Sequence, residues 1–344
     1  DRRWIARGSV LLELLCAVAL AMLAWTHTTT LLSLYLVAAL LGVARAFAGP
    51  ALGALAPNLV PREILPNAIA LSSIAWQSGA IAGPAMGGYL YAWAPVAPYA
   101  GSAILFTVSL IGLLMIPKIA RADIGRGPNA WQQMIEGLRY VRKNRLVLGA
   151  ISLDLFAVLL GGATAMLPVY ARDILHAGPA GLGHLRAAPA IGATLTAAFF
   201  AIRPLKSEVG VKMLIAVAIF GGATLVFGLS RNMPLSLACL TLLGAADMFS
   251  VYVRQSLIQL YTPDAMRGRV GAVSSLFISA SNELGEAESG FLAALIGPVA
   301  AVVAGGIGSI LVVGIWARKF PELRLARSFE PPDLPGAPEQ NGAR

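Results

Sequence analysis

The sequence predicts an all-α membrane protein whose transmembrane helices, about ten in number, form two pseudo-symmetric bundles. Composition, the length of the apolar runs and an internal repeat predict this fold class. Hydrophobic residues make up 57% of the 344 residues and charged residues only 12%, and the mean hydropathy is +0.74. Soluble domains carry about twice that charged fraction, so this chain needs lipid as its solvent.

Each of these apolar segments is about as long as the roughly 20 residues that a helix needs to cross a bilayer. Lys and Arg gather in alternate connections, which is typical of loops on the cytoplasmic side. The start of the chain and the connection at 118–145 are basic, whereas the turns near 94–96 and 297 carry no charge, so both termini are expected in the cytoplasm. The expected spans are residues 8–26, 29–58, 68–93, 97–117, 146–170, 180–202, 210–229, 233–256, 268–294 and 297–317.

The connection between the two halves has a helical pattern of its own. Apolar residues recur at three- and four-residue steps from Trp131 to Val141, and basic residues occupy the remaining face. An amphipathic helix on the inner membrane surface and a plain linker both fit this pattern. The expected divisions are an N-terminal bundle at 1–117, this linker at 118–145, a C-terminal six-helix bundle at 146–317 and a disordered, Pro-rich cytoplasmic tail at 318–344.

The third and ninth spans repeat one another at an offset of 202 residues, which separates Val60 from Thr262. Parallel repeats of this kind are common in transporters. Applied to the whole chain, the offset implies six plus six helices, of which the first two would precede Asp1, so we expect a fragment of a longer protein. The matching pairs include Pro61 with Pro263, Ala70 with Ala272, Ser72 with Ser274, Gly83 with Gly285 and Gly88 with Gly290.

The third span contains the stretch GAIAGPAMGG. Gly79, Gly83 and Gly87 are four residues apart on one helix face, where missing side chains let another backbone approach closely. Pro84 removes a backbone donor and bends the helix, and Gly88 completes the pattern GxxxGPxxGG. If only GxxxG were present, close packing between two helices would explain it without any functional role.

The complete pattern resembles that of the antiporter subgroup of the major facilitator superfamily, and the resemblance covers the whole membrane portion. The stretches LVPREILPNAIALSSIAWQSG and MRGRVGAVSSLFISASNELGEAESG resemble its transmembrane secretion effector branch, which includes enterobactin exporters. The resemblance implies a major facilitator fold in which the spans here are helices 3 to 12 of twelve. It also implies export from a bacterial cytoplasm, across the inner membrane, driven by inward proton flow.

Ionisable groups inside the spans are the best predictors of a site, because each costs roughly 2.5–3.5 kcal/mol at a helix centre. The span 268–294 carries a polar stripe on one face, which should face a watery cavity between the bundles. Glu283 lies near its middle, and a desolvated carboxylate there can take up and release a proton near neutral pH. The stripe consists of Ser275, Ser279, Asn282, Glu283, Glu286 and Gly290.

Further charges lie inside other spans. Asp247 and Arg254 are seven residues apart and share a helix face, and Asp154 and Arg45 lie in two more spans. They are predicted to line the pathway, with interhelical ion pairs that hold the two halves in one state as the alternative. The predicted substrate or proton pathway comprises Arg45, Trp76, Gln77, Asp154, Asp247, Arg254, Asn282, Glu283 and Glu286, and the predicted gating loops comprise Arg2, Arg3, Arg267 and Arg269.

The sequence therefore predicts a proton-coupled exporter of a small organic molecule, such as a siderophore or drug, that works by alternating access. A transporter with another direction or coupling, for nutrients or lipid, and an inactive truncated product are the alternatives. No HExxH, GxSxG or paired histidines favour an integral-membrane enzyme. The expected partners are a small-molecule substrate, protons and membrane lipid, and no cofactor, metal or nucleic acid is expected. The protein is expected to be a monomer.

Overall fold

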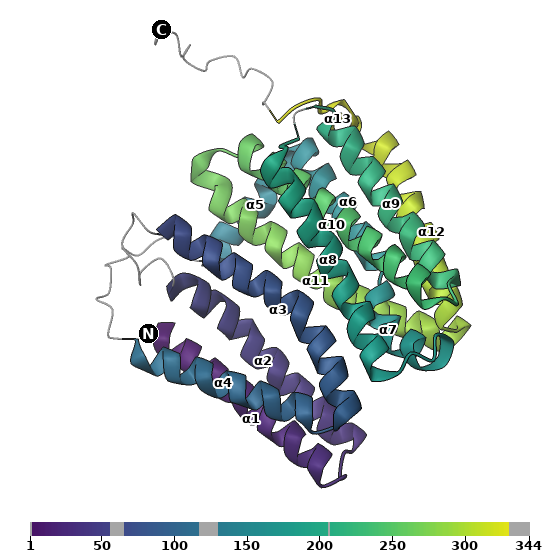
Figure 1. Ribbon diagram of the computed structural model, residues 1–344. Helices are drawn as coiled ribbons and strands as arrows, with labels where there is room; N and C mark the ends of the chain where they lie inside the picture. Colours follow the sequence, from purple (N-terminus) through teal and green to yellow (C-terminus); the bar gives the residue numbers. More distant parts are fainter. Residues whose placement is uncertain (1, 56–64, 117–129, 206, 330–344) are drawn as a thin grey trace. The chain divides into compact units, whose positions relative to one another are not determined.

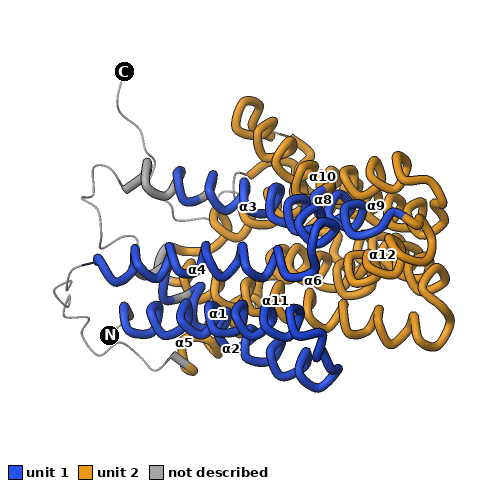
Figure 2. The backbone as a smooth tube through the Cα atoms, turned by 60° about the horizontal axis from the view of Figure 1, so that its bottom comes forward, with its two compact units in different colours: residues 1–126, 177–187 blue, residues 127–176, 188–344 orange. Residues whose placement is uncertain are grey.

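The computed structural model describes residues 2–55, 65–116, 130–205 and 207–329, and every element within them is helical (Figure 1). The chain forms two compact units (Figure 2). Unit 1 comprises residues 1–126 with 177–187, and unit 2 comprises residues 127–176 with 188–344. Part of the expected linker, 118–129, and most of the expected tail, 330–344, lie outside the described residues.

Eight helices among the described residues are long and apolar enough to cross a membrane, and they match eight of the expected spans. The other two expected spans are also helices, α3 (Leu65–Trp93, 29 residues) and α11 (Asp264–Ile296, 33 residues). Both exceed the roughly 20 residues that a span requires. Ser, Asn and Gly residues lower the hydropathy of both helices, and α11 also contains Glu residues, which is the property expected of helices that line a polar path.

Unit 1 contains α1 (Arg2–Trp25), α2 (Leu31–Leu55), α3, α4 (Ala97–Met115) and the first half of α8 (Gly178–Ile202). Helix α1 packs against α2 and α4, and α3 packs against α4. Small buried residues such as Ala6 and Val10 let these helices meet closely. The Arg7 guanidinium donates to the carbonyl of Leu113 at 3.1 Å and to that of Ile116 at 3.1 Å. It thereby satisfies carbonyls at the end of α4, as a cation at a helix C-terminus does.

Unit 2 contains the second half of α8 and a larger apolar core. Helix α9 packs against both α10 and α12, and α6 packs against α11 and α12. Leu153, Met213 and Leu257, from α6, α9 and α10, are fully buried in this core. Its helices are α5 (Ala130–Lys143), α6 (Arg145–Leu160), α7 (Leu167–Val169), α9 (Val209–Leu229), α10 (Met233–Tyr261), α11, α12 (Pro298–Lys319) and α13 (Pro321–Leu325).

The span expected at 146–170 is not one continuous helix. Helix α6 ends at Leu160 with Gly161 as its C-cap, and a 3₁₀ turn (Ala163–Met166), α7 and a π turn (Tyr170–Ile174) follow. Gly161 and Gly162 lower helix propensity, and Pro168 lacks the backbone donor that a regular helix would need. The break therefore follows from local sequence that the apolar run concealed.

Helix α5 is the helix expected within the linker. Val141 is buried in the core of unit 2, and Gly137 lies against the backbone of Arg269 on α11. Trp131 and Ile135, from the same apolar stripe, remain exposed. Helix α5 thus packs against the rest of unit 2 along one edge, while its place on the inner membrane surface stays a prediction.

Candidate functional site

The polar stripe of α11 lies on an exposed face of that helix. Asn282, Glu283 and Glu286 are all exposed, as are Ser275 and Ser279. The buried side of the same helix carries small and apolar residues, namely Val270, Val273, Ser274, Ser281, Gly285 and Ser289. The carboxylates therefore do not pack into the core of unit 2, and they need water, substrate or another charge as a partner.

The buried side of α11 meets the break in α6. A Cβ on Gly285 would lie 2.9 Å from the carbonyl oxygen of Leu159, and one on Gly162 would lie 2.8 Å from the carbonyl oxygen of Gly285. Only residues without a side chain allow this approach. The interrupted helix thus contacts α11 within one residue of Glu286, and interrupted helices recur at transporter binding sites.

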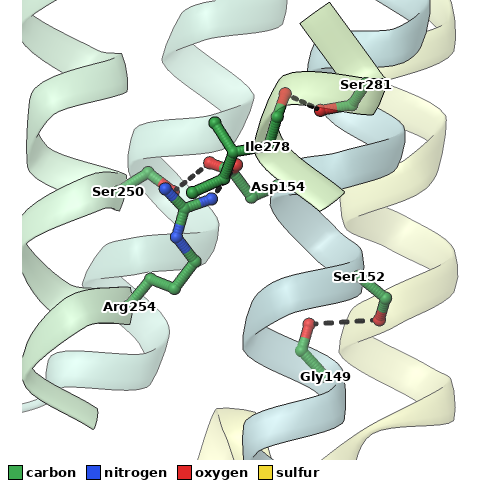
Figure 3. A network of polar contacts seen from close by, with 7 residues as sticks. All are labelled: Gly149, Ser152, Asp154, Ser250, Arg254, Ile278 and Ser281. Atoms are coloured by element: carbon green, nitrogen blue, oxygen red, sulfur yellow. Dashed lines mark hydrogen bonds and ion pairs between the residues drawn. The ribbon is translucent and has the colours of Figure 1, made fainter. Parts of the chain in front are cut away.

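A second polar group lies deep inside unit 2, between α6 and α10 (Figure 3). The Arg254 guanidinium forms an ion pair with Asp154, and the Ser250 hydroxyl donates to Asp154 Oδ1 at 3.4 Å. Figure 3 shows the guanidinium pointing towards both side chains. Arg254 is 2% exposed and Asp154 5%. Each charge is compensated at close range, which is the condition for burying it.

This pairing is interhelical, as in the alternative to a pathway role, but it lies within one half of the chain. Arg254 pairs with Asp154 on another helix, and Asp247, one turn before Ser250 on α10, is half-buried. Asp154 and Arg254 also belong to the same unit, so their ion pair holds α6 to α10 and does not join the two halves. Helix periodicity places Asp247 and Arg254 on one face, but it cannot show which neighbouring helix carries the partner.

The predicted pathway residues of unit 1 are spread over α2 and α3. Arg45 is exposed on α2 and lies within electrostatic range of Glu13, which is buried on α1. Trp76 is 80% exposed on α3, and the neighbouring Gln77 is half-buried.

The glycine motif of α3 makes its close contact through a different face from the expected one. Nothing lies within 4 Å of a Cβ placed on Gly79, Gly83 or Gly87. Instead, a Cβ on Gly88 would lie 2.5 Å from the carbonyl oxygen of Pro179 and 3.0 Å from Gly183 on α8.

The carbonyl of Pro84 faces the same α8 segment, 2.6 Å from a Cβ placed on Gly183. One turn beyond Pro84, Tyr89 Oη and His184 Nε2 are 2.8 Å apart. These contacts centre the packing seam between α3 and α8 on Pro84 and Gly88.

The predicted gating arginines have three different surroundings. Arg269 forms an ion pair with Glu136 on α5, and Arg267 Nε donates to the carbonyl of Gln259 at 2.7 Å, at the end of α10. Arg3 Nη1 lies 3.5 Å from the carbonyl of Ile116. Arg2 begins α1, and its side chain lies outside the described part. A gating role for these residues stays a prediction.

Sequence reasoning missed Ser250 and Glu136, the partners of Asp154 and Arg269. Ser250 lies four residues before Arg254 on the same face, which could have indicated it. The sequence also did not indicate a cavity of about 890 Å³ in unit 2, which contains none of the predicted pathway residues. No group of three or more metal-ligating side chains occurs in the ranges that the structure describes.

Residues 1–331 match the family described as transmembrane secretion effector. The chain belongs to that family. The chain is 29% identical to the enterobactin exporter EntS of Shigella boydii serotype 18 over 306 residues, which are 88% of this chain and 72% of the exporter. It is also 29% identical to EntS of Citrobacter koseri over 311 residues, 90% of this chain and 74% of that protein.

Solved structures show the same fold at low sequence identity. A POT family transporter in complex with 5-aminolevulinic acid aligns with a TM-score of 0.71 at 11% identity, over 94% of this chain and 82% of the other. A bacterial homologue of the iron transporter ferroportin, in an inward-facing state, gives a TM-score of 0.62 at 16% identity, over 94% and 83%. By family and by fold, the chain is therefore a multi-pass transporter of the major facilitator type, as the sequence predicts.

Proposed function

We propose that this protein exports a small organic molecule of the siderophore class from a bacterial cytoplasm in exchange for protons. The observation that carries the proposal is the exposed stripe on α11, where Glu283 and Glu286 stand on one face of a membrane-length helix. The relatives named as enterobactin exporters supply the direction and the substrate class. The protein then lies in the inner membrane with both termini in the cytoplasm.

The stability of these carboxylates depends on what surrounds the stripe. A charge at the centre of a spanning helix costs roughly 2.5–3.5 kcal/mol, and here two of them are one turn apart. They are tolerated if the stripe lines a path that water and substrate enter. A carboxylate that alternates between wet and occluded surroundings changes its proton affinity, so proton release can be coupled to substrate binding.

The broken helix supports α11 on the face opposite the stripe. The α6 break at Gly161 and Gly162 packs closely against Gly285, on the buried face of α11, and so can set the position of the helix that carries the carboxylates. The buried pair of Asp154 and Arg254 attaches α6 to α10 and keeps the break in place. Alternating access then opens the stripe to one side of the membrane at a time.

The test is transport of enterobactin by the protein reconstituted in liposomes, with an imposed proton gradient. Glu283→Gln and Glu286→Gln keep the side-chain size but cannot carry the proton. We expect at least a tenfold loss of gradient-driven flux, because general acid–base groups typically contribute about a hundredfold or more. Exchange of substrate for substrate needs no net proton transfer and should continue.

Glu288→Gln is the matched control, because Glu288 is on the same helix but half-buried and off the stripe. Its flux should resemble that of the unmodified protein. The proposal fails if the double variant of Glu283 and Glu286 retains gradient-driven flux, or if an uncoupler leaves flux unchanged. Inward accumulation driven by the same gradient would favour an uptake transporter instead.

A further inference from the structure

The cavity of about 890 Å³ in unit 2 lies at the ends of three spanning helices. Arg145 begins the span of α6, Tyr261 ends that of α10, and Lys319 ends that of α12. Arg145 and Tyr261 line the cavity, and Arg145 Nη2 donates to the carbonyl of Lys319 at 2.9 Å. The cavity therefore sits where spans end, at the depth of lipid headgroups.

The lining of the cavity has two chemical parts. Leu146, Leu325 and Ala326 give it an apolar wall, and Tyr140 donates its hydroxyl to the carbonyl of Tyr261 at 2.7 Å. Tyrosines are enriched at this depth because one end of the side chain is apolar and the other hydrated. Such a wall suits the glycerol and upper acyl region of a lipid better than a polar solute.

The charges at the cavity are mainly positive. Lys143, Arg145 and Arg327 face a single lining acid, Glu322. Glu322 is engaged through one oxygen, because Arg145 Nε donates to its Oε1 at 2.5 Å, while its Oε2 has no hydrogen-bond partner among the described residues. Within the described part of the chain, no acidic side chain pairs with Lys143 or Arg327, and both are exposed. Two cations from α5 and the segment after α13 thus stand uncompensated at the rim.

We propose that this cavity binds the phosphate headgroup of an anionic phospholipid, with Lys143 and Arg327 holding the phosphate and the apolar wall holding the glycerol and upper acyl chains. Basic pockets between spanning helices are suited to anionic headgroups, and each cation near a charged membrane surface contributes roughly fivefold to affinity. The lipid joins α5, α6 and α13 at one membrane face. This site is distinct from the proposed transport path, since none of the α11 stripe lines it.

The test measures binding of phosphatidylglycerol by the full chain in nanodiscs of phosphatidylcholine, titrated with the anionic lipid and followed by the unfolding temperature. The double variant Lys143→Gln/Arg327→Gln should lose about 30-fold in apparent affinity, since two such contacts are removed. The matched control, Arg142→Gln/Arg324→Gln, removes exposed cations from α5 and α13 that do not line the cavity. It should keep the affinity of the unmodified protein.

The unfolding temperatures of all three proteins in pure phosphatidylcholine should agree, which separates lipid binding from folding. Retention of phosphatidylglycerol through detergent purification by the unmodified protein and the control, but not by the Lys143/Arg327 variant, would support the site. Equal loss in both double variants would overturn it, because surface charge alone would then explain binding. Stabilisation by inorganic phosphate without lipid, at the same residues, would overturn the assignment to a phospholipid.

Discussion

The buried ion pair of Asp154 and Arg254 offers the sharpest stability prediction. Arg254 is 2% exposed, its Nε has no hydrogen-bond partner among the described residues, and its only acidic partner in that part of the chain is Asp154. Asp154→Asn removes the compensating charge and leaves the guanidinium buried. Breaking a buried pair in this way costs about 3–5 kcal/mol. At about 2–4 °C per kcal/mol, the unfolding temperature should fall by roughly 6–20 °C.

Arg254→Met should destabilise the protein as well, because it leaves the Asp154 carboxylate buried with only the Ser250 hydroxyl. The double variant Asp154→Asn/Arg254→Met removes both charges and should be more stable than either single variant. Thermal unfolding of the four proteins in one detergent, followed by circular dichroism, gives the coupling energy. Additive losses in the double variant, or a loss below about 1 kcal/mol in Asp154→Asn, would refute the reasoning.

Two further predictions concern a glycine contact and a surface acid. Gly88→Ala places a Cβ 2.5 Å from the Pro179 carbonyl oxygen and should lower the free energy of unfolding by about 1–3 kcal/mol. The Cβ of the control variant Gly79→Ala meets nothing within 4 Å, so that variant should be as stable as the unmodified protein or more so. Thermal unfolding of the two variants side by side would show the difference. The pKa of the Glu322 carboxyl lies below its usual 4.5, because its own backbone N–H donates a hydrogen bond to it and, as a smaller cause, Arg145 pairs with it. The ionised carboxylate therefore stabilises the folded state above that pH, and this stabilisation is lost as the pH falls. The difference in unfolding temperature between the unmodified protein and Glu322→Gln should therefore shrink in acid, and a difference that grows on acidification would contradict this sign.

The sequence predicts the helices and the α11 stripe well because both are local properties. Apolar length identifies the spans, and three- and four-residue steps assign Ser279, Asn282 and Glu286 to one face, which the structure shows to be exposed. The same periodicity gives the opposite face to Gly285 and Ser289. Nothing about this face requires knowledge of neighbouring helices.

Pairings between helices could not be predicted in this way. The choice of Asp154 over Asp247 as the partner of Arg254 depends on α6 lying beside α10, and the contact at Gly88 depends on the path of α8. The break after α6 could not be predicted, because the length of an apolar run does not show whether the helix that it forms is continuous. The cavity beside Lys143 forms from three segments that are far apart in the sequence.

The central claim is that the α11 stripe faces water within the membrane. Single cysteines at Ser279 and at Leu284, both exposed in the structure, would be tested in a background where the buried Cys16 and Cys239 are replaced by Ala. Leu284 lies on the same helix but away from the stripe. We expect that a membrane-impermeant maleimide labels position 279 in intact membranes, that substrate slows this labelling, and that position 284 stays unlabelled. Labelling at 284 with none at 279 would mean that the stripe faces acyl chains, which would contradict the proposed transport path.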